Sequence, residues 1–212
     1  MESRTPRAVL HYTHNLNPRL AVAVARHLKA PVEYRRSRPR DPAQAAVFEP
    51  LNPNLLCPIL VEGTRSTWET DAVACRLSQM VESSFWPWGD GRDGLVDLVK
   101  WLSWSAHHFN RAAGDLYFFR VSRPSWSNEV ADPAVLADLE RELRTHAKVL
   151  DDALQGRHWL VGDRMSYADF RVACALPFEK AALPLQGFDN IHRWHSQLMA
   201  LDAWREPFAG LE

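Results

Sequence analysis

The chain has 212 residues, with 25 basic and 26 acidic side chains, a formal net charge of -1 and an apolar fraction of 46%. This length allows one large domain or two modest ones around a substantial core. The balanced charge gives no electrostatic reason to expect nucleic acid as a partner. No apolar run approaches the roughly 18 residues that cross a bilayer, and the first residues lack the apolar segment of a secretory signal, so we expect no membrane partner. The 3 cysteines are well separated, which argues against a disulfide framework and favours the reducing cytoplasm.

The first part of the chain predicts alternating strands and helices. An apolar run at 8–12 predicts a strand, and Pro18 suits the first turn of the helix that follows. Further elements are a strand at 32–34, a short helix at 43–48, a hairpin of strands at 58–62 and 66–68, and a helix that Thr70 caps and that runs to about Val81. This order is a βαβ unit followed by a hairpin and a helix.

The character of the sequence changes at 83–91, where breakers and aromatic residues stand without a period. We therefore predict an N-terminal domain at 1–82, a linker at 83–90 and an all-helical domain at 91–212. An amphipathic pattern that starts at Leu95 predicts a long helix in this second domain.

Two further start signals lie in the second half. Asp132-Pro133 combines a capping residue with a proline in the first turn, and it predicts another long helix. Ser166 and Asp169 have the spacing of a capping box, with aspartate in the usual glutamate position.

Four stretches of the sequence carry a resemblance to a known family. They are Leu51-Asn52-Pro53, Cys57-Pro58-Ile59-Leu60, Glu69-Thr70-Asp71-Ala72-Val73 and the run from Gly162 to Phe170. In this order, between a strand-helix-strand start and a helical half, they resemble cytosolic glutathione S-transferases of the bacterial type, with an atypical catalytic loop. The resemblance implies an α/β thioredoxin-like N-terminal domain, an all-α C-terminal domain and a homodimer. It also implies glutathione as co-substrate, a cytoplasmic role in detoxification and no metal.

The resemblance assigns the binding of glutathione to Cys57, Pro58, Glu69 and Thr70. A cis bond between Cys57 and Pro58 would expose the main chain of Cys57, with which the tripeptide would pair as a short added strand. The carboxylate of Glu69 would meet the γ-glutamyl ammonium. The hydroxyl of Thr70 and the start of its helix would meet the γ-glutamyl carboxylate. These residues alone also allow an alternative without a ligand. In it, Thr70 only caps the helix and Glu69 is a solvated acid in the first turn.

Catalysis would require the bound thiol to ionise, because the thiolate is the nucleophile. Family members supply a stabilising donor from the loop after the first strand, commonly from Tyr, Ser or Cys. Here that loop is Thr13-His14-Asn15-Leu16-Asn17-Pro18, and it contains none of the three. We expect the Asn15 amide to be the donor, with Thr13, His14 and Asn17 as alternatives. Each of these residues also has a purely structural explanation. Asn15 can form the turn, Asn17 can act as an Asx cap, and His14 can be a surface residue.

The second substrate is expected on the helical domain. Trp101, Trp104 and His108 recur at three- and four-residue spacing and therefore share one helix face. Because helical aromatic residues are more often core than pocket, we assign only Trp104 and His108 to the second substrate.

Other chemistries have weaker support in the sequence. His192 and His195 form a two-ligand pair without carboxylate or thiolate partners at a known metal spacing. No Cys-x-x-Cys or nucleotide-binding motif occurs. One-cysteine thiol exchange through Cys57 is an alternative, but the position of Cys57 before the suspected cis-proline favours a backbone role instead.

The sequence therefore predicts a glutathione transferase that conjugates the glutathione thiolate to a small hydrophobic electrophile. The first alternative is a glutathione-dependent reductase of peroxides or disulfides that uses the same site. The second is a noncatalytic ligand-binding module of the same fold, which the lack of a loop hydroxyl motivates.

Overall fold

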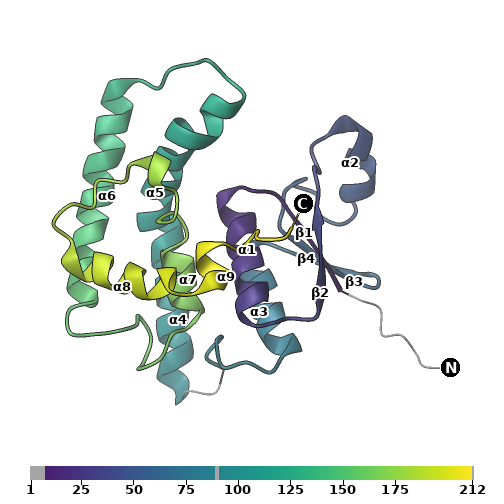
Figure 1. Ribbon diagram of the computed structural model, residues 1–212, viewed down its shortest axis with the longest axis horizontal. Helices are drawn as coiled ribbons and strands as arrows, with labels where there is room; N and C mark the ends of the chain where they lie inside the picture. Colours follow the sequence, from purple (N-terminus) through teal and green to yellow (C-terminus); the bar gives the residue numbers. More distant parts are fainter. Residues whose placement is uncertain (1–7, 89–90, 212) are drawn as a thin grey trace. The chain divides into compact units, whose positions relative to one another are not determined.

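A computed structural model describes residues 8–88 and 91–211 of the chain. These residues form two compact units (Figure 1). The first unit extends to Trp86 and also includes the segment from Leu201 onward, and the second extends from Pro87 to Ala200. No helix among the described residues is long and apolar enough to span a membrane.

The first unit is built on a four-stranded mixed sheet in the order β2-β1-β3-β4. The strands are β1 (Ala8–Tyr12), β2 (Val32–Arg36), β3 (Ile59–Glu62) and β4 (Arg65–Trp68). β1 and β2 are parallel, whereas β3 is antiparallel to both of its neighbours. Gly63 takes a φ of 60° in the turn between β3 and β4, which confirms the predicted hairpin.

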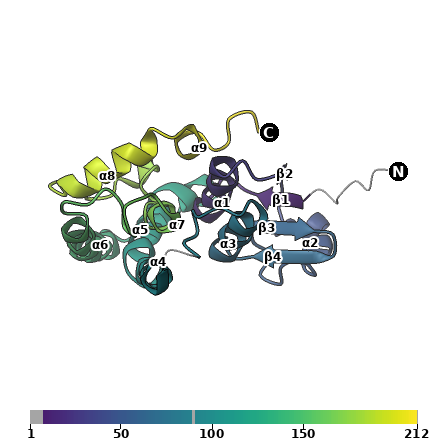
Figure 2. The ribbon, with the colours of Figure 1, turned by 90° about the horizontal axis from the view of Figure 1, so that it is seen from below.

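Three helices cover this sheet: α1 (Leu16–His27), α2 (Pro42–Phe48) and α3 (Thr70–Met80). α1 and α3 lie side by side on one face, and α2 lies on the other (Figures 1 and 2). The alternation of β1 explains the two layers, because Leu10 and Tyr12 are buried on one face while His11 contacts the ring of Phe48 from α2 on the other. α1 is the central helix of the unit, and the side chains from Pro18 to Ala25 are all buried.

The segment from Leu201 onward packs with the first unit, whereas the sequence predicts it as part of a helical domain over 91–212. It contains the short helix α9 (Asp202–Arg205), and the Trp204 side chain is fully buried. The buried guanidinium of Arg19 donates to the carbonyl oxygen of Trp204 and lies 5.0 Å from the centre of its ring. Arg26 donates to the carbonyl oxygen of Ala209. Two arginines of α1 therefore hold this segment, and a contact so distant along the chain leaves no local pattern in the sequence.

The second unit is helical. Its elements are α4 (Gly91–His107), α5 (Phe109–Tyr117), the π-helical turn η1 (Phe118–Ser122), the 3₁₀ turn η2 (Arg123–Ser125), α6 (Pro133–Ala153), α7 (Tyr167–Val172), the 3₁₀ turn η3 (Glu179–Ala181) and α8 (Asp189–Met199). The helix that Asp132-Pro133 predicts is α6, and the Asp132 side chain caps it by accepting from the Ala134 N–H.

The long helix predicted from Leu95 is interrupted in the structure. His108 adopts φ -125° and ψ -89°, which separates the end of α4 from the start of α5. Within α4 the core contact comes from Leu98, which is fully buried, while Leu95 and Val99 are exposed. The apolar spacing thus predicted the helix correctly, but it did not predict the break at His108.

Asp169 links three parts of the second unit. It is fully buried, and its carboxylate accepts hydrogen bonds from the Ser166 N–H (2.8 Å), the Leu160 N–H (3.0 Å) and the Trp194 indole N–H (2.9 Å). The first bond belongs to the predicted capping box of α7, and the third reaches α8. Burial raises the pKa of Asp169 to about 6, against the opposite effect of these donors. One carboxylate therefore caps the start of α7 and also binds a side chain of α8.

We predict that Asp169→Asn lowers the free energy of unfolding by about 2–3 kcal/mol, because the amide nitrogen cannot accept from the buried donors and leaves one of them unpaired. Urea unfolding followed by tryptophan fluorescence measures this loss. Asp163→Asn is the matched control, since Asp163 lies on the surface of the same loop and its change is expected to stay within about 0.5 kcal/mol. Equal effects of the two substitutions would contradict the role given to Asp169.

Candidate active site

The register of the sheet brings three separate segments of the first unit to one sheet end. Ile59, the first residue of β3, is paired with His11 near the end of β1 and with Trp68 at the end of β4. The loop that begins at Thr13, the Cys57–Pro58 bond and the Glu69-Thr70 pair are each one or two residues beyond this row. The predicted glutathione-binding and loop residues therefore lie together at the same edge.

Asn15 stands at the start of α1 with its side chain unengaged. It is the N-cap residue, with φ -85° and ψ 172°, but its side chain makes no capping bond. The Asn15 amide is exposed and has no hydrogen-bond partner among the residues that the structure describes. Asn17 lies inside the first turn of α1, so the alternative of an Asx cap by Asn17 is wrong. Thr13 is half-buried and His14 is exposed.

The charge next to this loop comes from Arg36. Arg36 is the register partner of Tyr12, is exposed, and forms no ion pair with any described residue. Burial lowers the pKa of His14, and the nearby Arg36 guanidinium lowers that pKa further. His14 is therefore uncharged at neutral pH, since its pKa lies below the ordinary histidine value of about 6.5. The loop has an exposed amide donor and a permanent cation beside it.

The main chain at Cys57 is open. The Cys57–Pro58 bond is cis, as the resemblance implied. Within the described parts of the chain, neither the N–H nor the C=O of Cys57 takes part in a backbone hydrogen bond. These two groups have the spacing that an added peptide strand requires.

The loop before Cys57 is organised by Asn52, which the sequence marks only as a turn former. The Asn52 side chain is buried; its amide donates to the Leu56 carbonyl (2.8 Å), and its oxygen accepts from the Asn54 N–H (3.0 Å). Leu55 takes a positive φ of 52° within the same loop. The side chain of Asn52 thus supplies hydrogen bonds in place of backbone bonds that the loop lacks, and it fixes the conformation of the residues that precede Cys57. The turn pattern Leu51-Asn52-Pro53-Asn54 was the signal available in the sequence.

The side chain of Cys57 lies in an environment that disfavours the reactive form of its thiol. It is half-buried, and burial raises the pKa of its thiol to about 12. The thiolate is the reactive form, so this cysteine stays protonated and is a poor nucleophile near neutral pH. The alternative of thiol exchange through Cys57 therefore has no electrostatic support.

Glu69 and Thr70 are each displaced by one position from their predicted places in the helix. Glu69, not Thr70, is the N-cap residue of α3, and its side chain makes no capping bond. Thr70 is the first helical residue and is buried, so both the predicted cap at Thr70 and the alternative of Glu69 as a first-turn acid are wrong. The side chain of Glu69 is exposed, which leaves it accessible to a ligand.

The backbone of Glu69 is strained. Its φ is 68° and its ψ is 129°, a combination that a residue with a Cβ rarely adopts. Such strain costs about 1–3 kcal/mol and persists mainly where surrounding structure or function requires it. The N–H groups of the first turn of a helix have no partner within that helix, and such groups are suited to bind an anion.

The predicted second-substrate residues belong to the second unit. Trp104 is half-buried on α4 and lies edge-on to Trp101, a core residue, with ring centres 5.2 Å apart. His108 is exposed at the break between α4 and α5, with its ring 6.4 Å from that of Trp104. The ring of His146 from α6 lies 5.0 Å from His108 and 6.3 Å from Trp104. The structure thus brings the two predicted residues together and adds a third.

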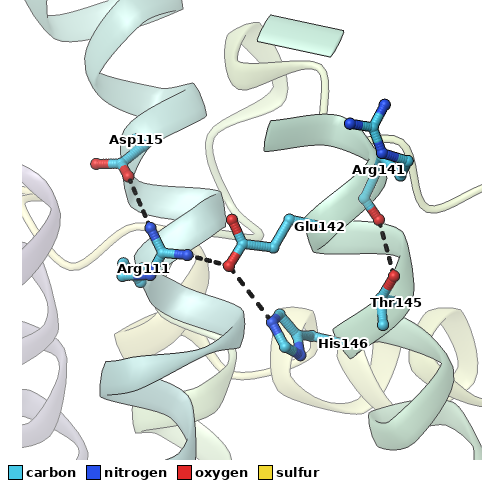
Figure 3. Close-up of polar contacts among 6 residues, drawn as sticks. All are labelled: Arg111, Asp115, Arg141, Glu142, Thr145 and His146. Atoms are coloured by element: carbon cyan, nitrogen blue, oxygen red, sulfur yellow. Dashed lines mark hydrogen bonds and ion pairs between the residues drawn. The ribbon is translucent and has the colours of Figure 1, made fainter. Parts of the chain in front are cut away.

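A carboxylate connects this group to α5. Glu142 accepts a hydrogen bond from Arg111 and lies 3.7 Å from the Nε2 atom of His146 (Figure 3). Asp115, one turn after Arg111, lies 3.8 Å from its guanidinium. Glu142 and His146 are four residues apart on α6, but nothing in the sequence indicated that this face would meet His108 and Arg111. The sequence therefore did not predict Glu142 and His146 as part of this group.

The residues considered for metal binding have other partners. The His192 ring nitrogen Nε2 bonds to the Leu185 carbonyl at 3.0 Å. Among the described residues, no group of three or more His, Cys, Asp and Glu side chains could hold a metal ion.

Comparisons with known proteins agree with this architecture. Residues 110–202 match the family described as glutathione S-transferase, C-terminal domain. The chain is 28% identical over 171 residues to FtsZ-localized protein A of Caulobacter vibrioides, covering 76% of this chain and 74% of the relative. It is 24% identical over 169 residues to glutathione S-transferase D6 of Drosophila melanogaster, covering 78% and 74%.

Solved structures give the same fold. The structure of Ure2p5 from Phanerochaete chrysosporium, cocrystallized with 1-(S-glutathionyl)-2,4-dinitrobenzene, matches with a TM-score of 0.81 at 20% identity, over 98% of this chain and 96% of that one. The chain therefore has the glutathione S-transferase fold, in which a four-stranded thioredoxin-like sheet is followed by a helical unit. By this fold and by the match of residues 110–202, the chain is similar to members of the glutathione S-transferase superfamily.

We predict that Cys57 resists alkylation by iodoacetamide at pH 8, because a thiol with a pKa near 12 forms almost no thiolate there. Mass spectrometry of the treated native protein measures the modified fraction, and free glutathione in the same tube is the reactive control. Alkylation of Cys57 at the rate of free glutathione would contradict the assignment of a purely main-chain role.

We predict that Glu69→Gly unfolds with a free energy about 1–2 kcal/mol above that of Glu69→Ala, because only glycine relieves the positive φ. If Glu69 binds the γ-glutamyl ammonium, both variants lose about tenfold or more in glutathione affinity, as expected for a charged hydrogen bond. Calorimetric titration and urea unfolding separate the two effects. Unchanged affinity in both variants would leave Glu69 as a solvated acid.

Proposed function

We propose that this protein is a glutathione transferase, which joins the sulfur of glutathione to a small hydrophobic electrophile. The observation that carries the proposal is the unpaired main chain of Cys57 at the sheet end that it shares with the Asn15 loop and with Glu69. We also propose, from the family resemblance, that the protein acts in the cytoplasm as a homodimer.

Glutathione would bind through its peptide backbone and its γ-glutamyl end. Its main chain would exchange hydrogen bonds with the N–H and C=O groups of Cys57 next to Pro58. The γ-glutamyl ammonium would pair with the Glu69 carboxylate. The γ-glutamyl carboxylate would accept from the Thr70 hydroxyl and from the N–H groups of the first turn of α3, where the helix dipole favours an anion.

The thiolate would form beside Asn15. A hydrogen bond to a charged group is worth about 1.5–3 kcal/mol, and an amide donor that favours the thiolate by this amount lowers the thiol pKa by about one to two units. The Arg36 cation acts in the same direction. The thiol proton leaves to solvent, because neither an amide nor a guanidinium accepts it.

The thiolate then attacks the electrophilic carbon. A sulfur–carbon bond forms with the sulfur electron pair, and the leaving group departs with the electrons of its own bond to that carbon. Trp104 and His108 are our proposed contacts for this second substrate, and His146 completes the same group of rings. Aromatic faces of this kind suit flat apolar electrophiles.

A noncatalytic module is the second candidate function. Two observations favour it: the loop from Thr13 to Pro18 has no Tyr, Ser or Cys, and one relative is named FtsZ-localized protein A. In this case the protein would act through assembly with a partner, and the glutathione site would be a remnant.

We predict that Asn15→Ala lowers kcat/KM for a chloro-nitroaromatic substrate by about tenfold to a hundredfold at pH 7, because loss of the donor raises the pKa of the bound thiol by one to two units. The acid limb of the pH profile of kcat/KM moves upward by the same amount. Spectrophotometric assay of conjugate formation over pH 5–9 measures both changes.

Asn17→Ala is the matched control, since Asn17 is an exposed asparagine two residues away. A loss at Asn17, Thr13 or His14 in place of Asn15 would transfer the donor role to that residue. Faster turnover of an organic peroxide than of the chloro-nitroaromatic would favour the reductase alternative. No glutathione turnover, together with binding to purified FtsZ, would favour the noncatalytic module.

A further inference from the structure

Phe208 reaches the loop that holds Asn15 from the far end of the chain. Its ring centre lies 4.3 Å from that of His14 and 5.5 Å from that of Tyr12. The rings of Tyr12 and His14 are 6.0 Å apart, and the three interplanar angles are only 13°, 19° and 26°. Three nearly parallel rings therefore pack together in one stack at the end of β1. One of them is His14, from the candidate catalytic loop.

The segment that carries Phe208 is firmly attached to the same unit. Trp204 is fully buried beneath it, and Pro207 is buried next to Phe208. Arg19 and Arg26 of α1 bond to carbonyl groups on either side of Phe208, at Trp204 and Ala209. α9 lies beside α1 in both views of the ribbon (Figures 1 and 2). Because both flanks are held, the position of the Phe208 ring is set by the fold of the unit and not by a free end.

His14 has few other restraints. Its neighbour Asn15 makes no side-chain capping bond, and Thr13 has no side-chain hydrogen bond with any described residue. His14 itself is exposed apart from the stack, with Arg36 as the charged group that influences it. Among the described residues, the rings of Phe208 and Tyr12 are therefore the side chains that His14 contacts, and only Phe208 comes from outside β1 and the loop that follows it.

We propose that Phe208 is a positioning residue for catalysis: by stacking on His14 it holds the loop so that the Asn15 amide faces the glutathione sulfur. The proposal rests on the proposed function, in which that amide stabilises the thiolate. Displacement of a catalytic group by about 1 Å can cost about a hundredfold in rate. An aromatic stack is suited to this task because it fixes the plane of the ring as well as its distance.

The kinetic test compares Phe208→Ala with Phe208→Tyr and with Phe188→Ala. Phe188 is the matched control, because it is half-buried beneath Arg144 in the second unit. Phe208→Ala is expected to lower kcat about tenfold at pH 7 and to move the acid limb of the pH profile upward, with KM for glutathione changed less than twofold. Phe208→Tyr keeps the stack and is expected to retain both properties. Wild-type kcat and pH profile in Phe208→Ala would overturn the proposal.

A double substitution separates positioning from general destabilisation. In a His14→Ala background the contact of Phe208 with the loop is already lost, although its contact with Tyr12 of β1 remains, so adding Phe208→Ala is expected to cause no further loss in kcat. Losses that multiply in the double variant would show that Phe208 acts independently of His14, and this result would also overturn the proposal.

A second measurement does not depend on glutathione. NMR titration of the His14 imidazole is expected to give a higher pKa in Phe208→Ala than in the wild type, because removal of the ring exposes His14 while Arg36 stays in place. The amide signals of Thr13 and Asn15 are expected to shift as well. If the wild type shows no glutathione turnover, the proposed function fails, but these signals still report the stack. Unchanged signals would overturn the role of Phe208 even in an active enzyme.

Discussion

The pairing of β3 with both of its neighbours is the constraint on which the candidate site depends. Ile59 is opposite His11 on one side and Trp68 on the other, so the residues just beyond this row meet at one sheet end. A one-residue shift in the pairing of β1 with β3 would separate the buried Leu60 from its buried partner Leu10. The hydrophobic core of the first unit thus determines where the polar groups of the site lie.

The electrostatics of the site differ from those expected of a hydroxyl-based enzyme. Cys57 is kept protonated by burial, and the lowered pKa of His14 keeps its imidazole neutral near pH 7. Under the proposed function, the uncharged amide of Asn15 and the exposed Arg36 cation would be the groups that favour a thiolate. Such an arrangement would stabilise an anion without offering a base, so the thiol proton would pass to solvent and the rate would depend on the position of the loop. We propose the stack with Phe208 as the contact that sets this position.

Local patterns predicted the structure well, and distant contacts were the part that they could not predict. The capping box of Ser166 and Asp169 and the turn at Gly63 follow from neighbouring residues, and both are present. The start of α3 was displaced by one residue because no propensity favours a glutamate with positive φ. The attachment of Trp204 to Arg19 and the meeting of His146 with His108 join residues from distant parts of the chain. Only tertiary packing determines such pairs.

The central claim is that glutathione lies along the main chain of Cys57, and the amide of that residue reports it most directly. In an NMR titration of the isotope-labelled protein with glutathione, the account predicts a shift of the Cys57 amide signal and slower exchange of its proton with solvent at saturation. The Glu62 amide, in the hairpin at the opposite end of β3, serves as the internal reference and is expected to stay unchanged. Saturable binding of glutathione that leaves the Cys57 amide unaltered would contradict the account.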